Sequence, residues 1–336
     1  MRSKEIQLGH GSGGRLTAEL MQRVFLPAYS NPLLAILNDQ AVFSLDGGRL
    51  AFTTDTFVVK PLFFPGGDIG KLAVNGTVND LAMGGARPRY LSASFVLEEG
   101  LPIDELKRVV ASMAEAAGQA EVEIVTGDTK VVERGHGDGI YINTAGVGVV
   151  EHACCLSANQ AQAGDTIIVS GPLGDHGMAV MARREGLEFD APIESDTQPL
   201  HDLVATMLAA VDGLRCLRDP TRGGLATTLN EIAESSGVGM VLDERAIPVR
   251  PAVAGLCELL GLDPFYVPCE GRLVAIVRAS DTDAVLEAMR AHPRGEQAIA
   301  IGQVVADHPS TVVMKTCVGG TRIVDVLSGE QLPRIC

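Results

Sequence analysis

The sequence has no excess of positive charge, since 27 lysine and arginine residues face 42 acidic residues and the formal net charge is −15. A general nucleic-acid surface or an anionic membrane surface is therefore excluded, because both partners would be repelled at long range. No apolar run approaches the length of a membrane span, and no apolar segment follows Met1-Arg2-Ser3-Lys4-Glu5. We expect a cytoplasmic protein with no nucleic-acid or membrane partner.

Two further absences concern the cysteines and repeats. The seven cysteines include no Cys-x-x-Cys pair, which excludes the usual zinc and dithiol redox motifs. No repeat of solenoid length and no low-complexity tract occurs. The chain has 336 residues of which 46% are hydrophobic, so it can bury a large core and is long enough for two domains.

Hydrophobic patterning divides the chain near Val150. Amphipathic helix patterns alternate with strand patterns up to that residue, and the alternation then restarts. The first helix is expected to end at Pro27, which cannot continue a helix interior. We predict an α/β (α+β) fold in three parts: residues 1–150, residues 151–326 and a mobile tail, residues 327–336.

The tail ends in Leu332-Pro333-Arg334-Ile335-Cys336. A thiol on a short, weakly packed end is where a nucleophile that must travel would stand, although such a cysteine is often only a site of oxidation. If extended, the tail could reach about 30 Å at roughly 3.3 Å per residue, enough to cross a domain face. Prenylation is excluded because its motif places the cysteine fourth from the end.

Four aspartates lie at or near the expected ends of strands and helices: Asp39, Asp55, Asp80 and Asp128. Mg²⁺ prefers carboxylate and phosphate oxygens, so aspartates that converge from element ends would hold the metal that neutralises a triphosphate. Aspartate is also a common cap and turn residue, which makes each one alone weak support. The four together favour a magnesium site.

The run Gly9-His10-Gly11-Ser12-Gly13-Gly14 precedes the first expected helix and could offer backbone amides to phosphate. The same run fits the Gly-x-Gly-x-x-Gly fingerprint of dinucleotide-binding proteins, with Asp39 near the place of a ribose-binding acid. It is not a Walker loop, because Arg15-Leu16 stand where Lys and Ser/Thr belong. Dinucleotide binding and a plain mobile loop both stay open as alternatives.

Two later segments run into expected helices and could line a nucleotide pocket. One is Gly171 to Gly177, which contains His176, and the other is Arg218 to Leu225, which contains Asp219 and Arg222. Ordinary strand-to-helix turns explain both segments equally well.

Taken together, these motifs resemble the family of ATP-using enzymes that includes aminoimidazole ribonucleotide (AIR) synthetase, selenophosphate synthetase and thiamine-monophosphate kinase. Within that family, the sequence is similar to the branch that serves hydrogenase maturation. The similarity spans the chain and rests on Gly9 to Gly14, Pro61 to Lys71, Val125 to Val132 and the final Pro333-Arg334-Ile335-Cys336. The cysteine or selenocysteine usual in the glycine loop of selenophosphate synthetases is missing, which argues against that activity.

The resemblance implies a two-domain fold, a homodimer made by the first halves, and an ATP site at that interface. It implies that a carbamoyltransferase, HypF, places a carboxamide on Cys336, which the protein dehydrates to a thiocyanate with ATP and Mg²⁺. The cyanide would then pass to iron held by HypC and HypD, for a [NiFe]-hydrogenase. A small-molecule synthetase or kinase of the same family, and an ATP-dependent scaffold, remain as alternatives.

The resemblance also assigns roles to residues. Cys336 carries the reacting group, Glu270 acts as base, and Lys130 is the orienting or stabilising cation. Asp39, Asp55, Asp80 and Asp128 bind Mg²⁺. The residues assigned to ATP are His10, Gly11, Ser12, Gly13, Gly14, Lys71, Asn75, Thr126, Gly127, Asp219 and Arg222.

Overall fold

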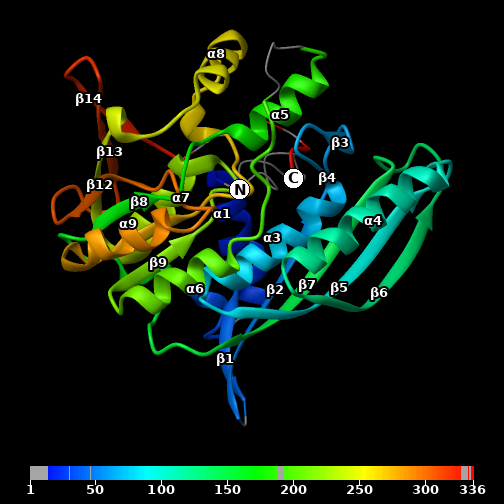
Figure 1. Cartoon of the computed structure of the whole chain (residues 1–336), viewed down its shortest axis with the longest axis horizontal. Coiled ribbons are helices and arrows are strands. Elements are labelled where there is room, and N and C mark those ends of the chain that lie inside the picture. The colour runs from blue at the N-terminus through cyan, green and yellow to red at the C-terminus, as the bar shows by residue number, and fades with distance from the viewer. Residues whose placement is uncertain (1–13, 30, 46, 188–192, 327–331, 333) are drawn as a thin grey trace.

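The chain folds around two main β-sheets, each with helices packed against it (Figure 1). The structure is a computed structural model and describes residues 14–29, 31–45, 47–187, 193–326, 332 and 334–336. This mixed architecture confirms the predicted α/β class. Across these residues, no helix combines the length and apolar character needed to span a membrane.

The N-terminal sheet has five strands in the order β1-β2-β7-β5-β6. Their bounds are β1 (Ala41–Leu45), β2 (Gly48–Phe57), β7 (Ile140–Val150), β5 (Arg87–Glu98) and β6 (Glu123–Val132). Only β5 and β6 are parallel, and the other neighbours are antiparallel. A dinucleotide-binding domain needs a mostly parallel sheet, so that alternative is wrong.

Helices α3 (Ile69–Met83) and α4 (Ile103–Gln119) lie over one face of this sheet (Figure 1). Strand β7 shows why the sheet has one covered face, because every second residue is buried from Ile140 to Val150. The residues between them are only partly buried, as expected for side chains that alternate across a strand. The face opposite α3 is therefore open.

Helix α3 begins at a capped end and packs closely on α4. The Asp68 carboxylate accepts hydrogen bonds from the amides of Gly70 (2.7 Å) and Lys71 (3.2 Å), which satisfies two donors of the first turn. A side chain at Gly70 would collide with the Val109 carbonyl of α4. Glycine at this position thus allows the two helices to approach each other.

The C-terminal sheet has seven strands in the order β14-β13-β10-β12-β8-β11-β9. Their bounds are β14 (Thr321–Val324), β13 (Val312–Lys315), β10 (Gly239–Asp243), β12 (Ile299–Val305), β8 (Thr166–Val169), β11 (Val274–Val277) and β9 (Leu214–Arg218). The helices of this half are α5 (Asp175–Arg184), α6 (His201–Ala210), α7 (Gly224–Ser236), α8 (Pro251–Leu260) and α9 (Thr282–Arg290).

Helices cover both faces of this second sheet. The central strands β8 and β11 read Thr-Ile-Ile-Val and Val-Ala-Ile-Val and are buried throughout. Ile167 packs in a core that includes residues of α7, whereas Ile168 packs with residues of α6 and α9 on the other face. A continuous apolar run is what a strand buried on both faces requires.

The remaining elements are short. They are α1 (Gly14–Leu20), a π-helical turn η2 (Met21–Phe25), α2 (Leu26–Tyr29), β3 (Phe63–Phe64), β4 (Gly67–Asp68) and the 3₁₀ turns η3 (Leu34–Ile36), η4 (Ala158–Gln160), η5 (Glu244–Ala246), η6 (Pro264–Tyr266) and η7 (Ala279–Asp281). The prediction that Pro27 ends the first helix is wrong, because helical structure continues to Tyr29. Pro27 falls in the first turn after a change of helix type, where its missing amide costs little.

The end of the chain lies between the two halves, near β3, β4 and α5 (Figure 1). Leu332 and Ile335 are buried in a core that also contains residues of β2, α3, α5 and α8. The described end of the tail therefore packs as part of the molecule. Strand β7 ends at Val150, and the domain limits drawn from the sequence stay a prediction.

Candidate active site

A group of partly or fully buried carboxylates forms the centre of the candidate site. Asp80 lies on α3, Asp55 on β2, Asp39 just before β1 and Asp219 just after β9. Burial raises the pKa of Asp80 well above its usual range, and the charges of Asp219, Asp55 and Asp39 raise it further. The Thr53 hydroxyl links two of them, lying 2.9 Å from Asp80 Oδ2 and 2.8 Å from the Asp39 carbonyl.

Two arginines supply the opposite charge. Arg218 Nε lies 2.6 Å from Asp39 Oδ2, and a terminal nitrogen of Arg222 donates to Asp55 Oδ1 at 2.5 Å. Burial still raises the pKa of Asp39 to about 6 against the attraction of Arg218. Burial and the charge of Asp39 raise the pKa of Asp219 to about 7. The carboxylates are thus only partly neutralised.

The chemistry of these side chains fits a hard divalent cation. Asp219 Oδ2 is buried and has no hydrogen-bond partner among the described protein atoms. Carboxylate oxygens that repel one another would be stabilised by the positive charge of Mg²⁺. Among the residues that the structure describes, no three acidic, histidine or cysteine side chains stand close enough to hold a metal as they are. The ion pairs of Arg218 with Asp39 and of Arg222 with Asp55 would have to open before these carboxylates could bind such a cation.

Cys336 lies beside this cluster. Its carbonyl accepts a hydrogen bond from the Val58 amide at 3.1 Å, just beyond the end of β2. Burial raises the pKa of the Cys336 thiol to about 12, the charge of Glu270 adds to the rise, and Arg222 opposes it. The structure therefore brings three of the predicted site residues together, namely Cys336, Glu270 and Arg222.

Glu270 is only 2% exposed. Its backbone amide donates to Asp196 Oδ1 at 3.0 Å, whereas its side-chain Oε1 has no hydrogen-bond partner among the described atoms. Burial raises the pKa of Glu270 well above its usual range, and the charges of Asp219 and Asp55 add to the rise. A carboxylate with a raised pKa and a free oxygen is a stronger base than an exposed glutamate.

One positioning residue escaped the sequence analysis. Asn79 of α3 is fully buried, and its Nδ2 donates to the carbonyls of Glu270 (3.2 Å) and Gln198 (3.1 Å). Its Oδ1 accepts from the Leu200 amide at 2.8 Å. Asn75, one turn earlier, lies 3.4 Å from Thr197 Oγ1. Two buried asparagines at helical spacing in an apolar helix were the signal available in the sequence.

Strand β6 carries four predicted site residues that lie apart from this cluster in the single chain: Thr126, Gly127, Asp128 and Lys130. Among the described residues, the side chain of Asp128 accepts a hydrogen bond from the adjacent Thr129 amide and from no other group. Within the described residues, the side chain of Lys130 makes no hydrogen bond or ion pair. The reason is topological, because β6 pairs with β5 at the outer edge of the sheet, away from β2 and Asp55.

The residues assigned to phosphate are placed only in part. His10, Gly11, Ser12 and Gly13 lie outside the described residues, and Gly14 is buried at the start of α1. Lys71 precedes Asp80 by nine positions on α3, about 13 Å at 1.5 Å per residue. Its Nζ donates to the Gly66 carbonyl at 3.0 Å. Lys71 is thus not part of the acidic cluster in this structure.

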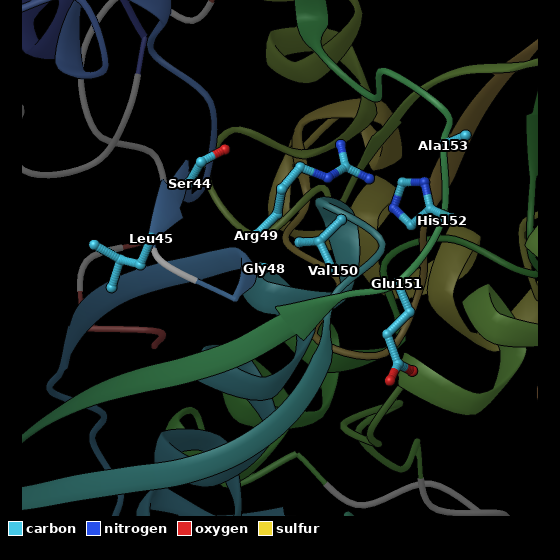
Figure 2. Close-up of a pocket in the computed structure, with 8 residues that line it drawn as sticks. All are labelled: Ser44, Leu45, Gly48, Arg49, Val150, Glu151, His152 and Ala153. Atoms are coloured by element: carbon cyan, nitrogen blue, oxygen red, sulfur yellow. The ribbon is translucent and has the colours of Figure 1, made fainter.

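Figure 2 shows a pocket of about 520 Å³ elsewhere on the molecule, where β1, β2 and β7 meet the segment after β7. The Arg49 side chain extends toward the His152 ring, while Glu151 points away (Figure 2). Burial lowers the pKa of His152, and the charge of Arg49 lowers it further. None of the predicted site residues lines this pocket.

Comparison with known proteins gives matches over both halves of the chain. Residues 37–150 match the N-terminal domain of AIR synthase-related proteins, and residues 162–315 match the C-terminal domain. The chain is 60% identical to the carbamoyl dehydratase HypE of Cupriavidus necator, over 100% of this chain and 96% of that protein. These similarities confirm the resemblance that the motifs predicted.

Two solved structures are similar over nearly their whole length. One is the hydrogenase maturation protein HypE in complex with ATP, at 49% identity, a TM-score of 0.84, and coverage of 99% of this chain and 100% of that chain. The other is a HypE-HypF complex, at 47% identity, a TM-score of 0.86, and coverage of 91% and 99%.

Proposed function

This chain belongs to the AIR synthase-related family and, within it, to the HypE carbamoyl dehydratases, and we propose that it dehydrates a carbamoyl group carried on its own Cys336. One observation carries the assignment of residues. Cys336 is half-buried and lies beside Glu270 and Arg222, at the edge of an acidic cluster suited to a metal and a triphosphate. A substrate group placed next to a free carboxylate oxygen is the arrangement that dehydration requires.

The balanced reaction turns the S-carboxamide and ATP into a thiocyanate, ADP, phosphate and a proton. The amide oxygen attacks the γ-phosphorus, because oxygen leaves carbon readily only as phosphate. Two N–H protons are then lost as the carbon–nitrogen triple bond forms and the carbon–oxygen bond breaks. Glu270 takes one of these protons, since its Oε1 is free and its pKa is raised by burial.

Arg222 fits the role of holding the reacting group. It donates to Asp55 at 2.5 Å and also faces the Cys336 thiol, whose pKa it lowers against the effect of burial. A guanidinium has several donors in a fixed fork, so it can hold an amide or phosphate oxygen while it keeps a carboxylate contact. Arg222 therefore joins the acidic cluster to the reacting sulfur.

Mg²⁺ would be held by Asp39, Asp55 and Asp80 and would supply positive charge to the triphosphate. Burial and the nearby acidic charges raise the pKa values of Asp39 and Asp80, and this supports the assignment because a bound cation would stabilise both carboxylates in their charged form. The glycine run before α1 and Lys71 are proposed to contact the phosphates.

A homodimer would complete the site. The open face of the N-terminal sheet exposes large apolar side chains, with Phe52 44% exposed and Tyr90 51% exposed. Exposed apolar surface on a sheet face is typical of an interface. Asp128 and Lys130 pair directly with Ser94 and Val96, so they stand on the same face of the sheet as these residues. We propose that β6 of one copy serves the site of the other.

The proposed partners follow from the chemistry of the tail. A relative has been solved as a HypE-HypF complex, and HypF is proposed to carbamoylate Cys336 here. The cyanide would pass to iron held by a HypC-HypD complex. The cytoplasmic location stays a prediction.

Mass spectrometry of the intact protein tests this function. The full chain is carbamoylated by HypF and then incubated with and without Mg-ATP, and Cys336→Ser serves as the control that cannot accept the group. We expect the loss of one water only with Mg-ATP, mapped to the peptide that contains Cys336. A carbamoyl adduct that persists in the presence of Mg-ATP would contradict the proposal and favour a scaffold.

A further inference from the structure

The end of the tail is held from two sides. The amides of Val58 and Lys60 donate to the carbonyls of Cys336 (3.1 Å) and Arg334 (3.2 Å), so the tail runs antiparallel to the segment after β2. The Ile335 carbonyl instead accepts from His176 of α5 at 2.8 Å. The main-chain oxygens of Arg334, Ile335 and Cys336 are thereby all held.

His176 can donate this bond in only one arrangement of its protons. A carbonyl oxygen only accepts, so Nε2 must carry the proton. Nδ1 lies 2.9 Å from Ser195 Oγ, and this oxygen also accepts from the Thr197 amide at 3.2 Å. Burial lowers the pKa of His176, which keeps the ring neutral. Ser195 therefore donates to Nδ1 and fixes the tautomer that serves the tail.

Packing restrains the ring of His176 as well. The residue is fully buried, and the Phe64 ring meets it edge-on with ring centroids 5.5 Å apart. The other side chains that hold the tail are more exposed. Arg184 donates to the Arg334 carbonyl at 2.8 Å, and the Arg334 side chain pairs with Asp138 at 2.9 Å. Exposed charged contacts of this kind hold a chain end only weakly.

The docked tail also contains a disfavoured backbone conformation. Arg334 has a φ of 53°, in the left-handed region that side chains with a Cβ rarely adopt. The contacts around it must offset this cost, so loss of one buried bond shifts the balance toward release. A tail that must leave the site benefits from such a balance.

We propose that His176, oriented by Ser195, is a positioning residue that sets the docked fraction of the tail and the placement of Cys336. This inference rests on the proposed function, because docking of the tail is useful only if Cys336 carries the substrate. In this proposal His176 recognises the tail through the Ile335 carbonyl, so the docked state depends on the backbone of the tail as well as on its cysteine.

The test compares two amides of different reach. His176→Gln places an N–H near the position of Nε2 and keeps a donor for Ile335, whereas His176→Asn places its amide near Nδ1 and cannot reach the tail. The full chain is treated with iodoacetamide without ATP or HypF, and labelling of each cysteine is followed by mass spectrometry. Cys155 and Cys317 are exposed and serve as internal references in the same molecule.

We expect His176→Asn to raise the labelling rate of Cys336 about fivefold or more, as loss of a buried hydrogen bond implies, with Cys155 and Cys317 unchanged. His176→Gln should stay near the wild-type rate. Equal Cys336 rates in the three proteins would overturn the proposal. A dehydration assay over a range of Mg-ATP concentrations adds a second readout, in which His176→Asn lowers kcat and leaves the KM for ATP unchanged. If labelling follows this pattern but the wild type never forms thiocyanate, the role of His176 in docking the tail is supported and the proposed function fails.

Discussion

Lys130 lies on an exposed edge strand and makes no contact with Cys336 within the described chain, so the role proposed for it requires a second copy. The perturbation is a mixed dimer in which one copy carries Lys130→Ala and the other carries Glu270→Gln. If β6 acts across the interface, one site receives both changes and the other receives neither. Each homodimer of a single variant, in contrast, has a lesion at every site.

The expected magnitude follows from this count of sites. A purified mixed dimer of C2 symmetry retains one intact site of two, so it should form thiocyanate at about half the wild-type rate per dimer. Either variant alone should be slower by about 10²-fold or more if its residue moves or stabilises the transferred proton. The mixed dimer should therefore form thiocyanate much faster than either homodimer of a single variant.

The assay uses two affinity tags to isolate the mixed dimer and intact-mass detection of thiocyanate on Cys336. A reciprocal pairing provides the control, in which a Lys130→Ala and Glu270→Gln double variant is paired with the wild-type copy. Action across the interface predicts no active site in that dimer, whereas action within one chain predicts half activity. Half activity in the reciprocal dimer together with none in the first would refute the reasoning.

Four other changes test the metal site, the interface, a buried charge and the packing of α3. Asp80→Asn should reduce the rise in melting temperature that Mg²⁺ alone produces in the wild type, because a proposed ligand is lost. Phe52→Asp should yield a monomer by light scattering after size-exclusion chromatography, because it places a charge on the proposed apolar interface. Burial and the charge of Asp196 raise the pKa of Asp175 to about 6, so wild-type stability is full near pH 4 and falls as pH rises through 6. Between pH 4 and pH 7, the free energy of unfolding of Asp175→Asn, measured with urea, should therefore rise by about 2 kcal/mol relative to that of the wild type. Gly70→Ala should destabilise by about 1–3 kcal/mol, because a collision with the carbonyl of α4 outweighs a helix-propensity gain of about 1 kcal/mol.

Local periodicity in the sequence predicts much of the fold. The amphipathic pattern of residues 102–120 becomes α4, Ile103–Gln119, and the β-rich run that ends at Val150 becomes β7, Ile140–Val150. Such elements bury one face, so their spacing alone reveals them. Pro27 failed as a stop signal because a change of helix type accommodates it, and no spacing rule shows that change.

The site was harder to predict because pairing between distant strands assembles it. The sequence placed Asp39, Asp55, Asp80 and Asp128 together, but strand order moves Asp128 to the edge strand of the single chain. Asp219, expected only to line a nucleotide pocket, instead joins the buried carboxylates. The order β1-β2-β7-β5-β6 is a long-range property that no local motif contains.

Asn79 shows how the fold fixes the distance between the acidic cluster and Glu270. It is adjacent to Asp80 on α3, so it is rigidly placed relative to the acidic cluster. Its side chain holds the backbone carbonyl of Glu270 in the other half of the molecule and the amide of Leu200. A fully buried amide whose donors and acceptor are all used allows little relative movement, since each broken bond would leave a buried polar group without a partner. The proposed phosphoryl-transfer and proton-transfer groups should therefore keep one geometry if the tail undocks, which would confine the proposed conformational step to the segment that carries Cys336.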